Sequence, residues 1–425
     1  MMHSSHGPTP PTPASPAAAT PTATTPTPPP TDLPSCMRLI DQARDAGDLP
    51  AMARHGEILA RMAPGHPITL TLQAELMRRG GEAARARAVL AAVLRQVPDF
   101  LPALLEAAEV EDALSSRTAA LGLRMKAIGL AENQRARGFP ASIATALDRA
   151  VAVVNAAMAE SLEAALAPHE AAHGREALGR IREAVDIFVG RRPRGDRHPE
   201  WSPGLMYIPG LEPLPWYEPA DFDWAAGVEQ ATPKVRAELL AAMGARAGFA
   251  PYVDDSGGRR RSDYWAELNR SRRWSAFHFS RHGRPVEENR RRCPATAALL
   301  DGLPLMRIPG YSPEAMFSVL EPKTRIPPHY GSVNGRLTVH LPLVVPPECG
   351  ALRVRGEARA WVEGKLLVFD DAMIHEAWND SEAVRAVLIF DVWNPQLSPA
   401  ERAAFSDVLQ AAQRFEAGNQ APAPA

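Results

Sequence analysis

The sequence predicts a chain of two parts, an α-helical N-terminal half and a β-rich C-terminal half. Three observations lead to this fold class. Residues 36 to about 134 are dominated by Ala, Leu, Arg and Glu, with polar breaks near 47–49, 64–67 and 80–81. Residues 140–190 continue as an Ala-rich amphipathic helix. After about 195, Gly, Pro and aromatic residues increase, and short strand-like runs alternate with turn signals, which is typical of a β-sandwich or barrel.

These changes in amino-acid composition and pattern predict four segments. Residues 1–34 are rich in Pro, Thr and Ala, bury too little apolar surface to fold, and are expected to form a disordered tail. Residues 35–194 are expected to form a helical, repeat-like region, and residues 195–405 the β-rich domain with flanking helices. Residues 406–425 are expected to hold the end of a C-terminal helix and a flexible tail.

Composition limits the cellular setting and the partners. The 425 residues are 45% hydrophobic and carry a net charge of -2. The overall charge therefore does not favour binding to a polyanion, and no nucleic-acid partner is expected. Cys36, Cys293 and Cys349 lie far apart and form no zinc motif, which favours reduced thiols. We find no secretory leader at the N-terminus and no apolar run near 18 residues. We therefore expect a cytoplasmic protein without a membrane span.

A repeat is visible in the helical half. Pro64 and Pro98 are 34 residues apart, and three pairs of small or apolar residues recur at the same interval: Leu70 and Leu104, Ala74 and Ala108, Ala86 and Ala120. This pattern resembles two or three degenerate tetratricopeptide repeats, which would recruit a protein partner. A plain helical bundle is the alternative.

The segment "HEAAH", residues 169–173, is a possible zinc motif, with His169 and His173 on one helix face and Glu170 as a base. Pro168 precedes it and Gly174 follows it, so a long uninterrupted metal-binding helix is not expected there. The alternative is a helix junction with solvated histidines. A zinc peptidase built on this motif is one rival function.

The stretch "RLTVHLPL", residues 336–343, alternates like a strand with two unlike faces. Leu337, Val339, Leu341 and Leu343 would share an apolar core face. Arg336, Thr338 and His340 would share the opposite face, where polar groups need partners.

Two histidines stand beside strand-like runs, His329 in "PPHYG" and His375 in "FDDAMIHEAWND". Histidines from opposite ends of a β-barrel can converge on one metal, and imidazole suits ferrous iron. The carboxylate that often lies two residues after the first histidine is replaced by Gly331.

From about 200 to 400 the chain resembles the aspartyl/asparaginyl β-hydroxylase family in its bacterial form. The matching stretches are "GLMYIPGL", "RWSAFHF", "FSVLEPKTRIPPHYGSVNGRLTVHLPL", "WVEGKLLVFDDAMIHEAWN" and "RAVLIFDVWNP". The resemblance implies a double-stranded β-helix (a jelly-roll or cupin-like barrel), dependence on Fe(II), 2-oxoglutarate and O2, and an upstream helical-repeat region. It also implies iron held by two histidines without a carboxylate, so Gly331 agrees with it.

The resemblance also implies roles for residues of this chain. His329 and His375 would bind the metal, and Ser318, His340 and Arg385 would bind 2-oxoglutarate. Arg385 begins a strand with Val387 and Ile389 on its face, where an arginine needs a partner such as the distal carboxylate of the cosubstrate. Asp371 would act beside the metal, and Trp274 and Arg336 would lie near the active site and the cosubstrate. Where some members have a second arginine after Arg336, this chain has Thr338.

The function implied is hydroxylation of an unactivated C–H, with release of succinate and CO2. The β-carbon of an aspartyl or asparaginyl group in a peptide, a protein or a carrier-bound amino acid is the expected target. A lipid-acyl hydroxylase and a non-catalytic scaffold with a degenerate barrel are the alternatives. Residues 259–292 hold eleven arginines against four acidic residues, a rim that would suit an acidic substrate or form a solvated face.

Overall fold

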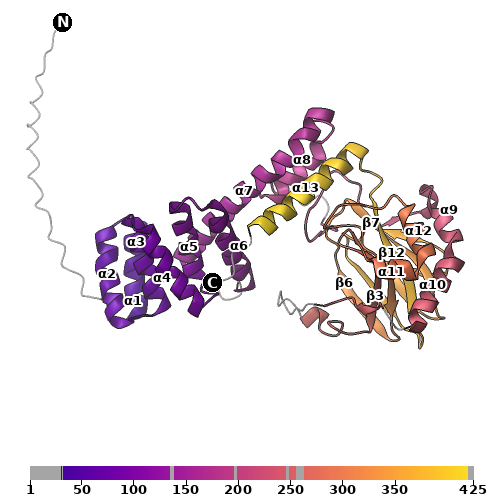
Figure 1. Ribbon diagram of the computed structural model, residues 1–425, viewed down its shortest axis with the longest axis horizontal. Helices are drawn as coiled ribbons and strands as arrows, with labels where there is room; N and C mark the ends of the chain where they lie inside the picture. Colours follow the sequence, from indigo (N-terminus) through magenta and orange to yellow (C-terminus); the bar gives the residue numbers. More distant parts are fainter. Residues whose placement is uncertain are drawn as a thin grey trace, which may run out of the picture.

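The computed structural model describes residues 30, 32–134, 138–195, 199–245, 248–254 and 263–419. Figure 1 shows a helical lobe formed by the first helices and a β-rich lobe, with α7, α8 and α13 between them. Of the predicted N-terminal tail, residues 1–29 and 31 lie outside the described residues, whereas Leu33 and Pro34 begin α1. At the other end, 406–418 belong to a helix, and 420–425 lie outside the described residues. The chain is therefore a helical region followed by a β-rich domain of antiparallel sheets, as the sequence predicts at this coarse level.

The helical lobe consists of helix pairs that repeat every 34 residues. The first helices of the pairs begin at Leu33, Pro67 and Leu101, and the second helices at Leu49, Ala83 and Arg117. Ala74, Ala108, Ala86 and Ala120, which recur at this interval in the sequence, are all fully buried, because small side chains let paired helices approach closely. The six helices are α1 (Leu33–Asp45), α2 (Leu49–Met62), α3 (Pro67–Arg79), α4 (Ala83–Gln96), α5 (Leu101–Ala113) and α6 (Arg117–Gln134).

A long helix, α7 (Ala141–His173), leaves the helical lobe and is followed by α8 (Gly179–Phe188). The C-terminal helix α13 (Pro399–Gly418) packs along α7. By length and composition alone α7 could cross a membrane, because an 18-residue window of it has a mean hydropathy of 1.4. In the structure 33% of that window is buried. The expectation of no such segment therefore needs this correction, although a buried helix of a globular domain passes the same test.

The expectation that Pro168 and Gly174 prevent a long helix at "HEAAH" is wrong. Helix α7 continues through Pro168 to His173 and ends at Gly174, whose φ is 84°. Fully buried Leu162 and Leu166 pack in the core, and this packing offsets the backbone hydrogen bond that a proline removes. His169 Nε2 lies 2.7 Å from Asp407 Oδ2, and Glu170 accepts hydrogen bonds from Arg182. No cluster of three or more potential metal ligands occurs among the described residues.

The β-rich domain contains two antiparallel sheets. The larger has the order β1-β10-β7-β12-β5-β3-β2, with β4 also paired to β3, and the smaller has the order β6-β11-β8-β9. The strands of the larger sheet are β1 (Trp216–Tyr217), β2 (Ala250–Pro251), β3 (Trp274–Arg281), β4 (Arg284–Pro285), β5 (Ala315–Leu320), β7 (Arg336–Val344), β10 (Leu367–Phe369) and β12 (Arg385–Trp393). Those of the smaller sheet are β6 (Thr324–His329), β8 (Ala351–Val354), β9 (Glu357–Ala360) and β11 (His375–Asn379).

Short helices accompany the larger sheet, and Figure 1 shows α9 to α12 on one side of it. They are α9 (Ala225–Gln230), α10 (Thr232–Ala245), α11 (Glu287–Arg292) and α12 (Pro294–Asp301), with short 3-10 helices η2 (Pro219–Asp221) and η3 (Asp263–Trp265). Leu337, Val339, Leu341 and Leu343 of β7 are fully buried and pack in one cluster with residues of α10 and α12. The predicted core face of this strand is confirmed, and its polar face points toward the other sheet.

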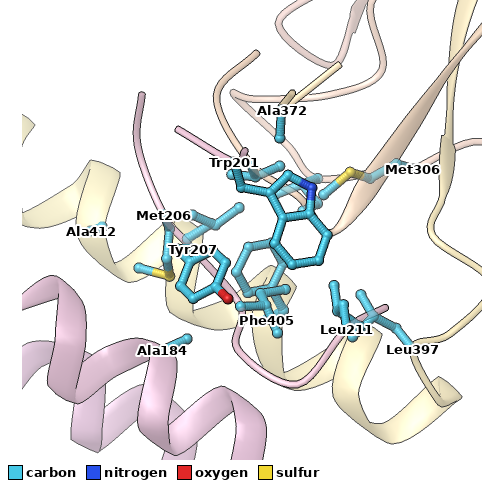
Figure 2. Packing of buried hydrophobic residues seen from close by; sticks show 14 of the residues in the cluster. Ala184, Trp201, Met206, Tyr207, Leu211, Met306, Ala372, Leu397, Phe405 and Ala412 are labelled. Carbon is cyan, nitrogen blue, oxygen red and sulfur yellow. The ribbon is translucent and has the colours of Figure 1, made fainter. Parts of the chain in front are cut away.

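Aromatic packing joins the segment after α8 to α8 and α13. Figure 2 shows Trp201, Tyr207 and Phe405 packed beside Ala184 of α8 and Ala412 of α13. Arg180 of α8 donates two hydrogen bonds to the buried Glu401 of α13, at 2.7 and 2.8 Å. Helix α13 is thereby held against α8.

Candidate active site

A cavity of about 310 Å³ lies on the inner face of the larger sheet, where that sheet faces the smaller one. All eight residues that the sequence singles out line it: Trp274, Ser318, His329, Arg336, His340, Asp371, His375 and Arg385. They come from β3, β5, β6, β7, β11 and β12 and from the loop after β10. The fold therefore brings together residues that are spread over more than a hundred positions, while their roles remain predictions.

His329 ends β6 and His375 begins β11, and the two are direct partners in the antiparallel pairing of these strands. Their ring centroids are 4.0 Å apart. Each Nδ1 lies within hydrogen-bond distance of a carbonyl two residues earlier, Pro327 O at 2.8 Å and Met373 O at 2.9 Å. A carbonyl only accepts, so the proton belongs on Nδ1, and the Nε2 lone pair stays available to a metal.

Burial keeps both imidazoles neutral. It lowers the pKa of His329 to about 3 and also lowers the pKa of His375. A neutral imidazole is the form that binds a transition metal, so this donor set fits ferrous iron.

A side chain at position 331 would displace the Asp371 carboxylate. A Cβ at this position would be 2.4 Å from the Asp371 carboxylate, and the Gly331 N–H donates to Asp371 O at 2.6 Å. The carboxyl group nearest this place therefore comes from residue 371, in the loop before β11.

Arg385 lies at one end of the cavity and is 1% exposed. Its Nε and Nη1 have no hydrogen-bond partner within the part of the chain that the structure describes. The guanidinium lies 4.5 Å from the centre of the Trp361 ring, and burial lowers the pKa of Arg385 to about 10. A buried, unpaired guanidinium that lines a cavity fits an anionic ligand such as a carboxylate.

Ser318 and His340 lie at the same end. Ser318 Oγ accepts a hydrogen bond from Trp274 Nε1 at 3.1 Å, and its hydroxyl proton remains for a ligand. His340 Nδ1 accepts from Trp361 Nε1 at 3.4 Å, so the proton of a neutral ring belongs on Nε2. Burial, then the charge of Arg385, lowers the pKa of His340 well below its usual value.

Arg336 lies at the other end and is fully paired. It donates to Asp371 Oδ2 at 2.6 Å and to Asp391 Oδ2 at 3.2 Å. Although burial alone would lower it, these carboxylates raise the pKa of Arg336 well above its usual value. Asp391 also accepts from Ser312 Oγ and from the backbone N–H of Glu314.

Four lining or adjacent residues were missed at the sequence level: Tyr252, Glu314, Trp361 and Asp391. A signal existed for Asp391, because it shares the strand face of Arg385 at an even spacing. The others come from loops or strand ends, where the sequence has no periodicity to place them. No arginine of the described part of 259–292 lines the cavity, and residues 259–261 lie outside the described residues.

Comparison with known proteins shows a family similarity over part of the chain. Residues 229–395 match the model of the aspartyl/asparaginyl β-hydroxylase family, and this segment contains all eight site residues. Over this segment the chain is therefore similar to the aspartyl/asparaginyl β-hydroxylase family.

Three relatives illustrate the similarity. The human aspartyl/asparaginyl β-hydroxylase is 32% identical over 237 residues, which cover 54% of this chain and 29% of the relative. The Rhizobium tropici ornithine lipid ester-linked acyl 2-hydroxylase is 37% identical over 188 residues, 44% of this chain and 63% of the relative. The mouse aspartate β-hydroxylase domain-containing protein 2 is 39% identical over 139 residues, 32% of this chain and 40% of the relative.

The aligned region is thus less than two thirds of each of these relatives. A solved Pseudomonas putida prolyl-4-hydroxylase covers 40% of this chain and 98% of its own at 16% identity. The TM-score of this superposition is 0.23.

Proposed function

We propose that the chain is an Fe(II)- and 2-oxoglutarate-dependent dioxygenase that hydroxylates an unactivated C–H. The target would be the β-carbon of an aspartyl or asparaginyl residue or of a similar amino-acid substrate. When bound, iron and 2-oxoglutarate would supply the oxidising chemistry, with O2 consumed and succinate and CO2 released. The observation that carries the proposal is the unpaired Arg385 in the same cavity as two neutral histidines whose Nδ1 atoms are already held.

The residues of the chain would divide the work. His329 and His375 would hold the iron through Nε2. Arg385 would pair with the distal carboxylate of 2-oxoglutarate, and Ser318 Oγ–H and His340 Nε2–H would donate to the same cosubstrate. Trp274 would orient Ser318, since its Nε1–H donates to that hydroxyl. Arg336 would hold Asp371 beside the metal site through their ion pair.

The proposal also covers the fold type and the helical repeats. The two facing sheets would form a double-stranded β-helix, and the 34-residue helix pairs would be tetratricopeptide-type units that recruit a protein partner. A groove of about 990 Å³ along these helices would suit such a partner. A cytoplasmic location stays a prediction from the sequence.

A lipid-acyl substrate is the second candidate, because exposed apolar side chains adjoin the site. Tyr330 is 42% exposed and Ile374 is 38% exposed, and each is the chain neighbour of a predicted iron ligand. Such a rim could also receive the apolar part of a peptide.

The test is anaerobic addition of Fe(II) and 2-oxoglutarate, followed by visible absorbance and then by succinate release when O2 is admitted. We expect a charge-transfer band and succinate with the wild type, and neither with His329→Ala or His375→Ala. His173→Ala, at an exposed histidine outside the cavity, is the matched control and should retain both. A folded, metal-loaded wild type that gives neither band nor succinate would favour the non-catalytic scaffold instead.

A further inference from the structure

The end of the cavity opposite Arg385 has an excess of negative charge. Glu314, Asp371 and Asp391 line it together with a single cation, Arg336. Arg336 is taken up by the two aspartates, so Glu314 is the carboxylate without a balancing charge.

The surroundings of Glu314 do not neutralise it. In the described part of the chain, the basic groups within 4.0 Å of its carboxylate are His278, at 3.6 Å, and His282, at 3.3 Å. Burial lowers the pKa of His278 to about 4 and also lowers the pKa of His282, so both rings are neutral near pH 7. Burial, and then the charge of Asp391, raises the pKa of Glu314 to about 7, although a hydrogen bond from the backbone N–H of His282 opposes this rise. Near pH 7 the carboxyl group is therefore partly ionised, and a bound ammonium group would favour its ionised form.

An aromatic wall faces the same space. Tyr252 stacks on Trp274 with ring centroids 4.1 Å apart, and both side chains line the cavity. Tyr252 and Glu314 line the same cavity, and burial, then the charge of Glu314, raises the pKa of Tyr252 to about 12. Aromatic faces and carboxylates both attract a cation and would repel the side-chain carboxylate of an acidic substrate.

The cavity is also a ligand site on independent grounds. Arg385 lines it at the other end, is 1% exposed, and has two nitrogens without a hydrogen-bond partner in the described part of the chain. The cavity is therefore polarised, with a cation for the cosubstrate at one end and excess carboxylate at the other. An anionic ligand would be attracted to the Arg385 end and repelled from the acidic end.

We propose that the acidic end receives a free ammonium group of the substrate. This inference rests on the proposed dioxygenase function and deepens it. For hydroxylation at an aspartyl or asparaginyl β-carbon, the group is the α-ammonium of a free, N-terminal or carrier-bound amino acid. An internal residue of a polypeptide lacks this charge, because its nitrogen is a neutral amide.

The test uses substrate pairs that differ only in this charge: aspartic acid α-amide and asparagine α-amide, each beside its N-acetyl derivative. Binding is measured by calorimetry on the full chain with 2-oxoglutarate, both without metal and with Fe(II) under anaerobic conditions. We expect the free amine of at least one pair to bind about 10- to 100-fold more tightly, as for a charge-assisted hydrogen bond. Glu314→Gln, which keeps the size and an oxygen acceptor, should reduce this preference below about 3-fold.

Glu287→Gln, at an exposed carboxylate outside the cavity, is the matched control and should keep the full preference. Equal binding of both members of each pair, or binding of neither, overturns the inference. The charge-transfer band and succinate release test the proposed function separately. A wild type with band and succinate but no amine preference would retain the function and lose the inference, whereas amine preference without either signal would do the reverse.

Discussion

Arg336 and Arg385 line one cavity from neighbouring strands, yet the fold treats them in opposite ways. Arg336 has two buried carboxylate partners, Asp371 and Asp391, at 2.6 and 3.2 Å. Arg385 has no carboxylate partner among the described residues, and two of its nitrogens have no hydrogen bond there. A buried charge is costly unless it is paired. We therefore assign Arg336 to the stability of the site and Arg385 to the binding of an anionic ligand.

The largest expected effect is on stability, from Arg336→Met. It would leave Asp371 and Asp391 buried without their cation, and breaking such a pair typically destabilises by about 3–5 kcal/mol. Urea unfolding of the full chain, followed by tryptophan fluorescence, measures the loss. Adding Asp391→Asn to Arg336→Met should recover part of the lost stability. If Arg336→Met alone were as stable as the wild type, the proposed pairing would be contradicted.

Arg385→Met should act on cosubstrate binding and not on stability. We expect the affinity for 2-oxoglutarate to fall about 100-fold or more, because each charge-assisted hydrogen bond contributes about 1.5–3 kcal/mol. The free energy of unfolding without ligand should stay the same or rise, because an unpaired buried charge is removed. Calorimetry with 2-oxoglutarate and urea unfolding give the two values. Arg284→Met, at an exposed arginine, is the control and should change neither.

Gly331→Ala should disturb the Arg336 end from the side of the metal site. Its Cβ would meet the Asp371 carboxylate at 2.4 Å and push it from Arg336. Overpacking of this kind typically destabilises by about 1–3 kcal/mol. Gly227→Ala, which adds a Cβ into open space within α9, should instead be neutral or stabilise by about 0.5–1 kcal/mol. Equal stability of both variants in urea would show that Asp371 has room to move.

The smallest expected effect is a change in pH dependence at Asp370, next to the Arg336 pair. Burial, and then the charge of Asp371, raises the pKa of Asp370 to about 8, whereas the unfolded chain ionises near its usual value. Between these values the folded state binds the extra proton, so this group makes the protein less stable as pH rises.

Asp370→Asn removes that titration. The stability of the variant relative to the wild type should therefore improve by about 1–3 kcal/mol between pH 5 and pH 7.5. Urea unfolding at these two pH values tests it. An identical pH slope in both proteins would show that Asp370 is already ionised, with its oxygens held by the N–H groups of Trp201 and Ala372.

The opposite fates of the two arginines could not be predicted from the sequence. Strand alternation places Arg336 and His340 on one face of their strand, and Arg385 on a face that it shares with Val387 and Ile389. It does not show which carboxylates meet either arginine. The pairing itself joins positions 35 and 55 residues apart. Glu314 and Tyr252, at a strand end and next to a two-residue strand, carry no periodic signal and were missed.

The sequence by itself determined what depends on local spacing. The 34-residue interval set the helix pairs, the alternation of 336–343 set the two faces of β7, and several long stretches matched one hydroxylase family. Only the tertiary structure decided which buried charges meet, why α7 continues through Pro168, and why Asp371 leaves room for nothing larger than glycine at 331. The reason is physical: periodicity follows from the geometry of one element, whereas charge pairing and steric exclusion depend on how distant elements pack.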